Sequence, residues 1–255
     1  MKLPEVTYSF SLLTPAMIGG AEGKSASAEM RVASIRGQVR WWHRKADLSP
    51  SCNHVWGQTE PSVIASQVSL TLLPSITPDR KEVPILPHKQ SGFRDSILPP
   101  KKQTLILRRL VGCDKGHWTA AQQAVKLWLL LGGLGLRVNR AAGSVWPDGE
   151  WVPTNEDDLK RLLATLGYHH PVRLAAASLA TTPQELRRAA SDTVDGSPHL
   201  FGCINPRKPS PLKMKVIRLG ADYRLLLTGL DDAGMDAARR ALAGKDLGRA
   251  EWHRI

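Results

Sequence analysis

The sequence has 255 residues, of which 42% are hydrophobic, so it can form one large domain or two domains of about 100 to 150 residues. No apolar run reaches the ~20 residues of a membrane span, and the N-terminal residues lack the apolar segment of a signal peptide, which predicts a cytoplasmic protein with no membrane partner. The 35 Lys and Arg residues exceed the 23 Asp and Glu residues by 12. This excess favours a polyanionic partner, although composition alone fits an ordinary basic protein equally well.

The first half alternates between strand and helix patterns. A basic helix is predicted with Ser34 as its N-cap, and a second helix is expected to stop at Gly132. In chain order, the predicted elements are a strand at 5–14, a glycine- and serine-rich loop at 18–27, the basic helix at 34–46, a strand at 65–73, a long exposed loop at 74–103, a strand at 104–112 and a helix at 118–133.

The second half predicts helices at 157–167, 183–191 and 232–244, with a hairpin formed by 211–220 and 222–230. Short strands mixed with helices in this order indicate an α+β fold with antiparallel sheets, close to a split βαβ or ferredoxin-like plan. We expect a first domain at 1–150, which carries the long loop, and a second, shorter domain at 151–255.

The basic helix has two different faces. Its apolar stripe is formed by Ile35, Val39, Trp42 and Ala46, and an adjacent stripe holds Arg36, Arg40 and Arg44. Like charges at this spacing repel each other, which an anionic partner would relieve. Gly37 weakens the helix but permits a close approach to its backbone. A solvated basic face and a membrane-surface helix are the alternatives, and Trp41 can either pack under a loop or stack on a base.

A glycine-rich loop, "GGLGLRVNRAAGS" at 132–144, follows the second helix. Its glycines allow backbone N–H groups to point at a ligand, and arginine, asparagine and serine side chains add charge and hydrogen bonds. It matches neither a P-loop nor a dinucleotide-binding turn. The sequence therefore predicts either a clamp for a sugar–phosphate backbone or a simple flexible turn.

Metal and cofactor chemistry is not expected. The three cysteines lie far apart, and the pairs Cys52 with His54 and Cys113 with His117 each offer two ligands, whereas a structural zinc site needs four. His43 could act as a general base on RNA, but no orienting partner follows from the sequence. We therefore predict no metal, no cofactor and no catalytic residue.

Four segments resemble the signature regions of the RAMP superfamily, and in particular the first RAMP subunit of type III-B (Cmr) CRISPR effector complexes: "TPAMIGG" (14–20), "SIRGQVRWWHRK" (34–45), "GGLGLRVNRAAGS" (132–144) and "PSPLKMKVIRLG" (209–220). The resemblance implies two ferredoxin-like (RRM-like) domains, of which the second is abbreviated. It also implies guide RNA, other complex subunits and possibly target RNA as partners. Arg140, Ala141, Ala142 and Gly143 replace an expected Arg-Gly-aromatic-Gly run, so no base stacking is expected from this loop.

The RNA-binding residues predicted from the basic helix, the loops and this resemblance are Ile18, Gly19, Gly20, Lys24, Arg36, Gly37, Arg40, Trp41, Arg44, Lys45, Gly132, Gly133, Gly135, Arg137, Asn139, Arg140, Gly143 and Ser144. The leading hypothesis is a non-catalytic subunit of a CRISPR ribonucleoprotein in antiviral defence, which holds the guide-RNA backbone near its 3′ end. One alternative is a RAMP-type endoribonuclease using His43 or Asp95. Another is a scaffold whose basic face meets an acidic protein. The arginines and the glycine-rich loop are expected to form one shared cationic cradle.

Overall fold

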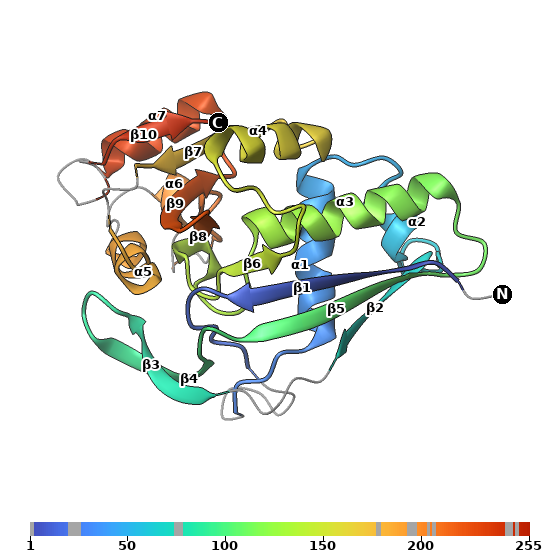
Figure 1. Ribbon diagram of the computed structural model, residues 1–255, viewed down its shortest axis with the longest axis horizontal. Helices are drawn as coiled ribbons and strands as arrows, with labels where there is room; N and C mark the ends of the chain where they lie inside the picture. The colour runs from blue at the N-terminus through green and yellow to red at the C-terminus, as the bar shows by residue number, and fades with distance from the viewer. Residues whose placement is uncertain are drawn as a thin grey trace.

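The computed structural model describes residues 3–19, 27–73, 79–176, 180–192, 198–202, 205, 208–242, 247 and 250–255. Within these residues the chain forms two successive βαββαβ units, each built on a four-stranded antiparallel sheet (Figure 1). The predicted α+β fold with two ferredoxin-like sheets is confirmed. The domain boundary predicted after residue 150 falls between the last strand of the first sheet and the helix that precedes the second.

The first sheet has the strand order β2-β5-β1-β6, and all its neighbouring strands are antiparallel. Its elements are β1 (Glu5–Leu12), α1 (Val32–Lys45), α2 (Cys52–Trp56), β2 (Val68–Leu73), β3 (Arg80–Leu86), β4 (Ser91–Ile97), β5 (Lys102–Arg109), α3 (Lys115–Leu131), the 3-10 helix η1 (Val138–Arg140) and β6 (Val145–Asp148).

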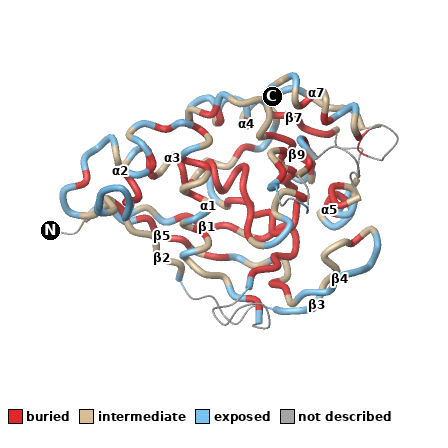
Figure 2. Tube along the Cα trace, turned by 180° about the vertical axis from the view of Figure 1, so that it is seen from behind, coloured by how far each residue is buried: buried red, intermediate tan, exposed pale blue. Residues whose placement is uncertain are grey.

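The core of the first unit lies between this sheet and the helices α1 and α3 (Figure 2). Alternation along β1 buries Tyr8, Phe10 and Leu12 on the helix side. The rings of Phe10 and Trp128 meet edge to face with their centroids 5.3 Å apart. The predicted apolar stripe of the basic helix is confirmed as its core-facing side, because all four of its members are buried in the core: Ile35, Val39, Trp42 and Ala46.

The two long helices, α1 and α3, differ in how their N-termini are capped. The N-cap of α3 is Asp114, whose side chain accepts the His117 N–H, and the helix ends at Gly132 as predicted. The N-cap of α1 is Arg31, whose side chain has no hydrogen-bond acceptor and cannot cap; its backbone carbonyl accepts the N–H groups of Ser34 and Ile35. The prediction of Ser34 as N-cap is therefore wrong.

The segment 74–103 was predicted to be an irregular loop, and this prediction is wrong. It contains the antiparallel hairpin β3–β4, in which Val83 pairs with Arg94, and β5 begins at Lys102. The local sequence, rich in charge and proline, disfavours this structure. Contacts that are distant in sequence stabilise it instead: Arg187 of the second unit donates to the Pro84 carbonyl at 2.8 Å.

The second sheet has the order β10-β7-β9-β8 and repeats the topology of the first. Its abbreviation lies in strand length, since β7 has four residues and β10 three. The second half of the described chain is formed by α4 (Glu156–Thr165), β7 (Val172–Ala175), α5 (Pro183–Ser191), α6 (Pro198–Phe201), β8 (Lys213–Leu219), β9 (Asp222–Thr228), α7 (Asp232–Ala241) and β10 (Trp252–Arg254).

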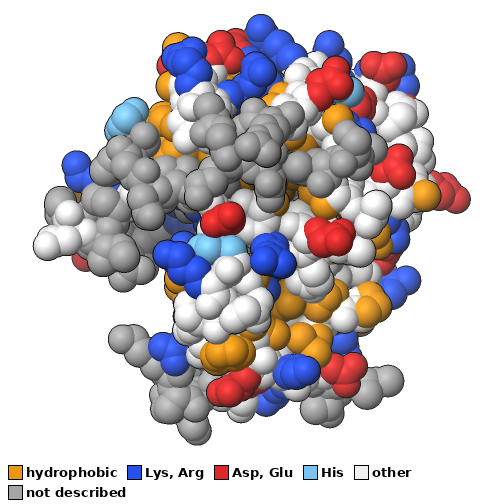
Figure 3. Space-filling model, turned by 90° about the vertical axis from the view of Figure 1, so that its left-hand side faces the viewer, with side chains coloured by type: hydrophobic (Ala, Val, Ile, Leu, Met, Phe, Trp, Pro, Cys, Tyr) orange, Lys and Arg blue, Asp and Glu red, His pale blue; other side chains and the backbone are white. Residues whose placement is uncertain are grey.

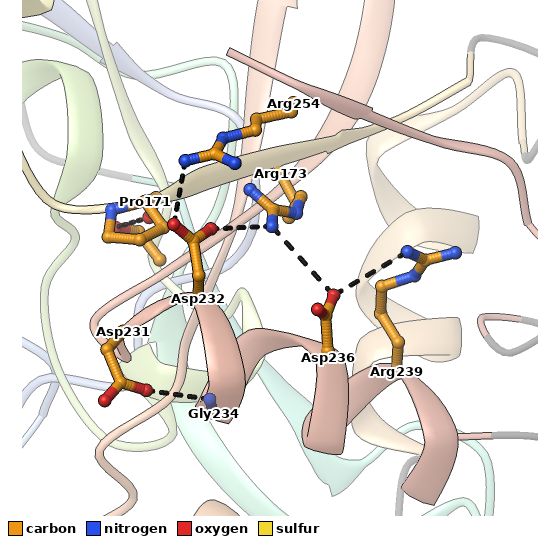
Figure 4. A network of polar contacts seen from close by, with 9 residues as sticks. Pro171, Arg173, Asp231, Asp232, Gly234, Asp236, Arg239 and Arg254 are labelled. Carbon is orange, nitrogen blue, oxygen red and sulfur yellow. Dashed lines mark hydrogen bonds and ion pairs between the residues drawn. The ribbon is translucent and has the colours of Figure 1, made fainter.

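An ionic network ties the short strands of this sheet to α7 (Figure 4). Asp232, at the start of α7, accepts hydrogen bonds from Arg173 of β7 at 2.8 Å and from Arg254 of β10 at 2.7 Å. Arg173 is buried, and its second carboxylate neighbour, Asp236, is 4.0 Å away.

On the face nearest α5 and the hairpin, basic and acidic side chains are interspersed, so the excess positive charge is not gathered there (Figure 3).

Replacing Asp232 by Ala should lower the free energy of unfolding by about 1–3 kcal/mol, because it leaves the buried Arg173 guanidinium without its close partner. Asp236→Ala removes two longer contacts, to Arg173 at 4.0 Å and to the half-exposed Arg239 at 3.9 Å, and should cost about 0.5 kcal/mol or less. Urea denaturation of the two variants measures both effects. Equal losses would contradict this assignment.

Candidate nucleic-acid interface

Helix α1 separates two cavities, so the predicted site residues are divided between its two sides. Arg36 and Arg40 line a cavity of about 550 Å³ together with α2 and the segment that follows it. Trp41 lines another of about 210 Å³ together with the glycine-rich loop and β8. The single shared cradle predicted from the sequence is therefore wrong, because the arginine stripe and the glycine-rich loop face different cavities.

We call the first cavity the arginine pocket; its walls include Arg36, Arg40, Trp56, Gly57, Glu60, Val63 and Ile64. Arg40 Nη1 donates to the carbonyls of Gly57 at 2.8 Å and of Trp56 at 3.2 Å, and Arg36 also donates to the Trp56 carbonyl. These carbonyls lie at the C-terminal end of α2, where a cation is favoured.

The next arginine of the stripe contacts the other end of α2. Arg44 is exposed, and its Nη1 lies 3.3 Å from Cys52 Sγ. The three arginines of α1 therefore hold α2 in place. They take part in none of the ion pairs found among the described residues.

We call the second cavity the lysine pocket; its walls include Gln38, Trp41, Trp42, Gly132, Asn139, Lys213 and Lys215. Lys213 Nζ lies 4.5 Å from the Trp41 ring centroid and donates to Asn139 Oδ1 at 2.8 Å. Lys215 is buried, and its Nζ donates to the Leu129 carbonyl in the last turn of α3 at 2.6 Å. Residues of both units therefore line the pocket.

Positive charge in the lysine pocket is not neutralised by the described part of the protein. Burial lowers the pKa of Lys213 to about 8, with a further contribution from the charge of Lys45, and burial lowers the pKa of Lys215 well below its usual value. No carboxylate pairs with these lysines in the described ranges. Trp42 Nε1, also buried, has no hydrogen-bond partner. Donors in excess of acceptors suit an anion.

The glycines of the loop allow close packing inside the protein. Gly143 has a φ of +59°, and a Cβ there would lie 1.9 Å from the Leu134 carbonyl oxygen. Its N–H donates to the Pro15 carbonyl at 2.8 Å and so does not point at a ligand, contrary to the sequence-based prediction. A Cβ on Gly132 would lie 2.6 Å from Trp42 Nε1, so this glycine makes room for the unpartnered donor.

Two predicted RNA contacts, Arg140 and Ser144, are buried where the units meet. Arg140 Nη2 donates to the Phe201 carbonyl at 3.2 Å, and its guanidinium carbon lies 4.9 Å from the Phe201 ring centroid. Burial lowers the pKa of Arg140 to about 10. Ser144 Oγ accepts the Val216 N–H at 3.1 Å. Both side chains hold the second sheet against the loop, and Ser144 also lines the lysine pocket.

The remaining predicted residues lie in different environments. Ile18 is buried, whereas Gly19 and Arg137 are exposed. Gly20 and Lys24 lie outside the described residues. Gly37 is exposed, and no atom lies within 4 Å of a Cβ built there, so the surface of α1 is open at this position.

Sequence reasoning missed the two lysines of β8 as site residues. Lys213 and Lys215 lie two residues apart on one strand, and period-two spacing directs both toward the same side. The segment "LKMKV" carries this signal. What it does not reveal is that β8 lies next to α1 and the glycine-rich loop.

Both side chains considered for catalysis have structural partners. His43 is buried; its Nδ1 accepts from Trp56 Nε1 at 3.2 Å, and its Nε2 lies 2.9 Å from the Pro50 carbonyl. Burial lowers the pKa of His43, which favours the neutral ring. Asp95 Oδ2 accepts the Ala28 N–H at 2.7 Å. These contacts connect α1 to α2 and the hairpin to the segment before α1.

The two central strands of the first sheet lack, on their outer face, the aromatic platform of an RNA-binding RRM. These strands place Ser9 opposite Thr104 and Thr7 opposite Ile106 on this face, with Ser11 opposite Lys102. RRM domains stack bases on aromatic side chains at such positions. Base stacking on these central strands is therefore not available in the first unit.

The described residues contain no group of three or more His, Cys, Asp or Glu side chains placed to hold a metal ion. None of their helices combines the length and apolar character needed to cross a membrane.

The sequence pattern of the RAMP superfamily matches residues 9–146, a segment that begins within β1 and holds the basic helix and the glycine-rich loop. The chain belongs to the RAMP superfamily. This establishes the resemblance inferred from the signature segments. Among curated proteins, none matches this RAMP protein by sequence.

Solved structures share the fold over nearly the whole chain. Cmr1 from Pyrococcus furiosus is 17% identical, with a TM-score of 0.62 over 91% of this chain and 89% of that one. A chain of the type III-B Cmr-beta complex bound to cognate target RNA is 9% identical, with a TM-score of 0.55 over 95% and 99%. A chain of this complex bound to target RNA and AMPPnP, in the presence of ssDNA, is 10% identical, with a TM-score of 0.54 over 97% and 99%.

The same substitution at two glycines should have opposite effects. Gly143→Ala should lower the free energy of unfolding by about 3 kcal/mol or more, because the added methyl group meets backbone at a left-handed position. Gly37→Ala should raise it by about 0.5–1 kcal/mol, because alanine favours the helix and meets no atom. Chemical denaturation measures both, and a destabilised Gly37→Ala protein would show that this helix surface is covered.

Stability of the free protein should rise between about pH 8 and about pH 10.5. The folded state releases the Lys213 proton near pH 8, whereas the unfolded chain retains it to about pH 10.5, so the unfolded state binds more protons in this interval. Lys213→Met should flatten the profile and be more stable than the wild type near neutral pH. Superimposable profiles, measured by denaturation at each pH, would contradict the assignment.

Proposed function

We propose that this RAMP protein is a non-catalytic RNA-binding subunit of a type III-B CRISPR ribonucleoprotein in antiviral defence. In this proposal the lysine pocket holds the backbone of the guide RNA near its 3′ end. The observation that carries it is the pair of lysine side chains, Lys213 and Lys215, beside Trp41, which have no carboxylate partners among the described residues. The charge of Lys45 is close enough to lower the pKa of Lys213. The fold likeness to chains of RNA-bound Cmr complexes supports the setting.

A phosphate group in the lysine pocket would offset the unfavourable burial of lysine side chains that have no carboxylate partner. It would interact with Lys213 and Lys45, raise the pKa of Lys213 toward its usual value, and give the buried Trp42 N–H an acceptor. Arg137, exposed in the adjoining loop, adds charge along the path of a chain. These are contacts to the backbone, so we expect binding to depend little on base sequence.

A non-catalytic role agrees with the hydrogen bonds that the two side chains considered for cleavage form within the protein. His43 has both ring nitrogens within hydrogen-bond distance of protein atoms, and Asp95 holds a backbone N–H. Neither lines the lysine pocket. RNA recovered with the purified protein should therefore be uncut by this subunit.

The test is the salt dependence of binding to single-stranded RNA. The slope of log affinity against log salt changes by about 0.7 for each phosphate contact, so Lys213→Met should weaken binding and lower the magnitude of the slope by about 0.7. Lys160→Ala, which removes an exposed lysine of α4, is the matched control and should leave the slope unchanged. Filter-binding titrations from about 50 to about 200 mM salt measure both. Equal slopes in the wild type and Lys213→Met would reject the lysine pocket as the RNA site.

A further inference from the structure

The arginine pocket lies on the opposite side of α1 from the proposed RNA site. In Figure 2, α2 lies at the end of the molecule where the chain begins. Residues of α2 and of the segment that follows it line the arginine pocket. At about 550 Å³ it is more than twice the volume of the lysine pocket. The proposed function makes no use of it.

The charges of this pocket are positioned but not neutralised. The guanidinium groups of Arg36 and Arg40 are held by the carbonyls of Trp56 and Gly57, and neither takes part in an ion pair within the described ranges. Each guanidinium has five N–H donors, so the bonds to these carbonyls leave others available. Two fixed arginine forks suit a carboxylate, which they can bind through paired hydrogen bonds.

The rest of the pocket has the character of a protein-binding surface. Val63 is 84% exposed and lines the pocket next to Ile64, and Glu60 contributes a negative charge. A phosphate backbone carries only negative charge and has no aliphatic group to bury. A protein segment can carry charges of both signs and can also bury an aliphatic side chain. The lysine pocket differs in charge, since no carboxylate lines it.

We infer that the arginine pocket binds an acidic segment of another protein subunit, with an Asp or Glu side chain between Arg36 and Arg40 and an aliphatic side chain on Val63. This inference rests on the proposed function, which supplies the assembly in which such a subunit is found. Helix α1 then contacts RNA on one side and protein on the other.

Photo-crosslinking in the assembled ribonucleoprotein tests this surface. With p-benzoylphenylalanine in place of Val63, the structure predicts a crosslink to a different protein subunit. In place of Leu136, which is 46% exposed in the glycine-rich loop, the same group should crosslink to RNA. A crosslink from position 63 only to RNA, to a second copy of this chain or to nothing would overturn the inference. Absence of an RNA crosslink from position 136 would instead count against the proposed function.

A matched pair of substitutions tests the same surface by assembly. Val63→Glu places a carboxylate beside Arg36 and Arg40, where it competes with the partner's acid, and should lower incorporation into the complex by about tenfold or more. Val111→Glu changes a valine that is 86% exposed and does not line the pocket, and should assemble normally. Thermal denaturation should show both variants folded, since neither side chain is buried. Equal incorporation of the two variants, or an equal loss, would overturn the inference.

Discussion

The close packing of the glycine-rich loop against the rest of the protein is the constraint on which the candidate site depends. Gly143 lies against the Leu134 carbonyl so tightly that no side chain fits, and its N–H is bonded to Pro15. The same loop reaches the second sheet through Ala141, whose N–H donates to the Met214 carbonyl at 3.1 Å. Because this packing brings β8 beside α1, two lysines of the second unit can share a cavity with a tryptophan of the first.

The lysine pocket illustrates how a site can lower the stability of its own protein. Burying a cation without a carboxylate is unfavourable, and here the cost shows as the lowered pKa values of Lys213 and Lys215. The hydrogen bond from Lys215 to Leu129 offsets part of it. An arrangement that is unfavourable in the free protein and favourable around an anion is what a binding site for a polyanion requires.

The arginines of α1 and its residues beside the lysine pocket lie on different sides of the helix. The arginine side chains point toward α2, where backbone carbonyls accept hydrogen bonds from the Arg40 guanidinium. Trp41 and Lys45 point toward the second unit. Repulsion between arginines at four-residue spacing is therefore relieved in part by the protein itself, through the end of a short helix. The hairpin β3–β4 is likewise stabilised from a distance, since Arg187 of α5 bonds to it.

Local sequence patterns predicted the order of most helices and strands, because periodicity and helix caps such as Gly132 depend on neighbouring residues. They also indicated the family, through motifs whose residues are contiguous. They did not predict β3–β4, whose pairing depends on contacts distant in the chain. Which cationic residues lie together depends on the packing of distant segments: Arg140 is buried, Arg36 and Arg40 lie away from the glycine-rich loop, and Lys213 lies beside it. The reason is that a helix face or strand face is set locally, whereas what it faces depends on how closely distant backbones can approach.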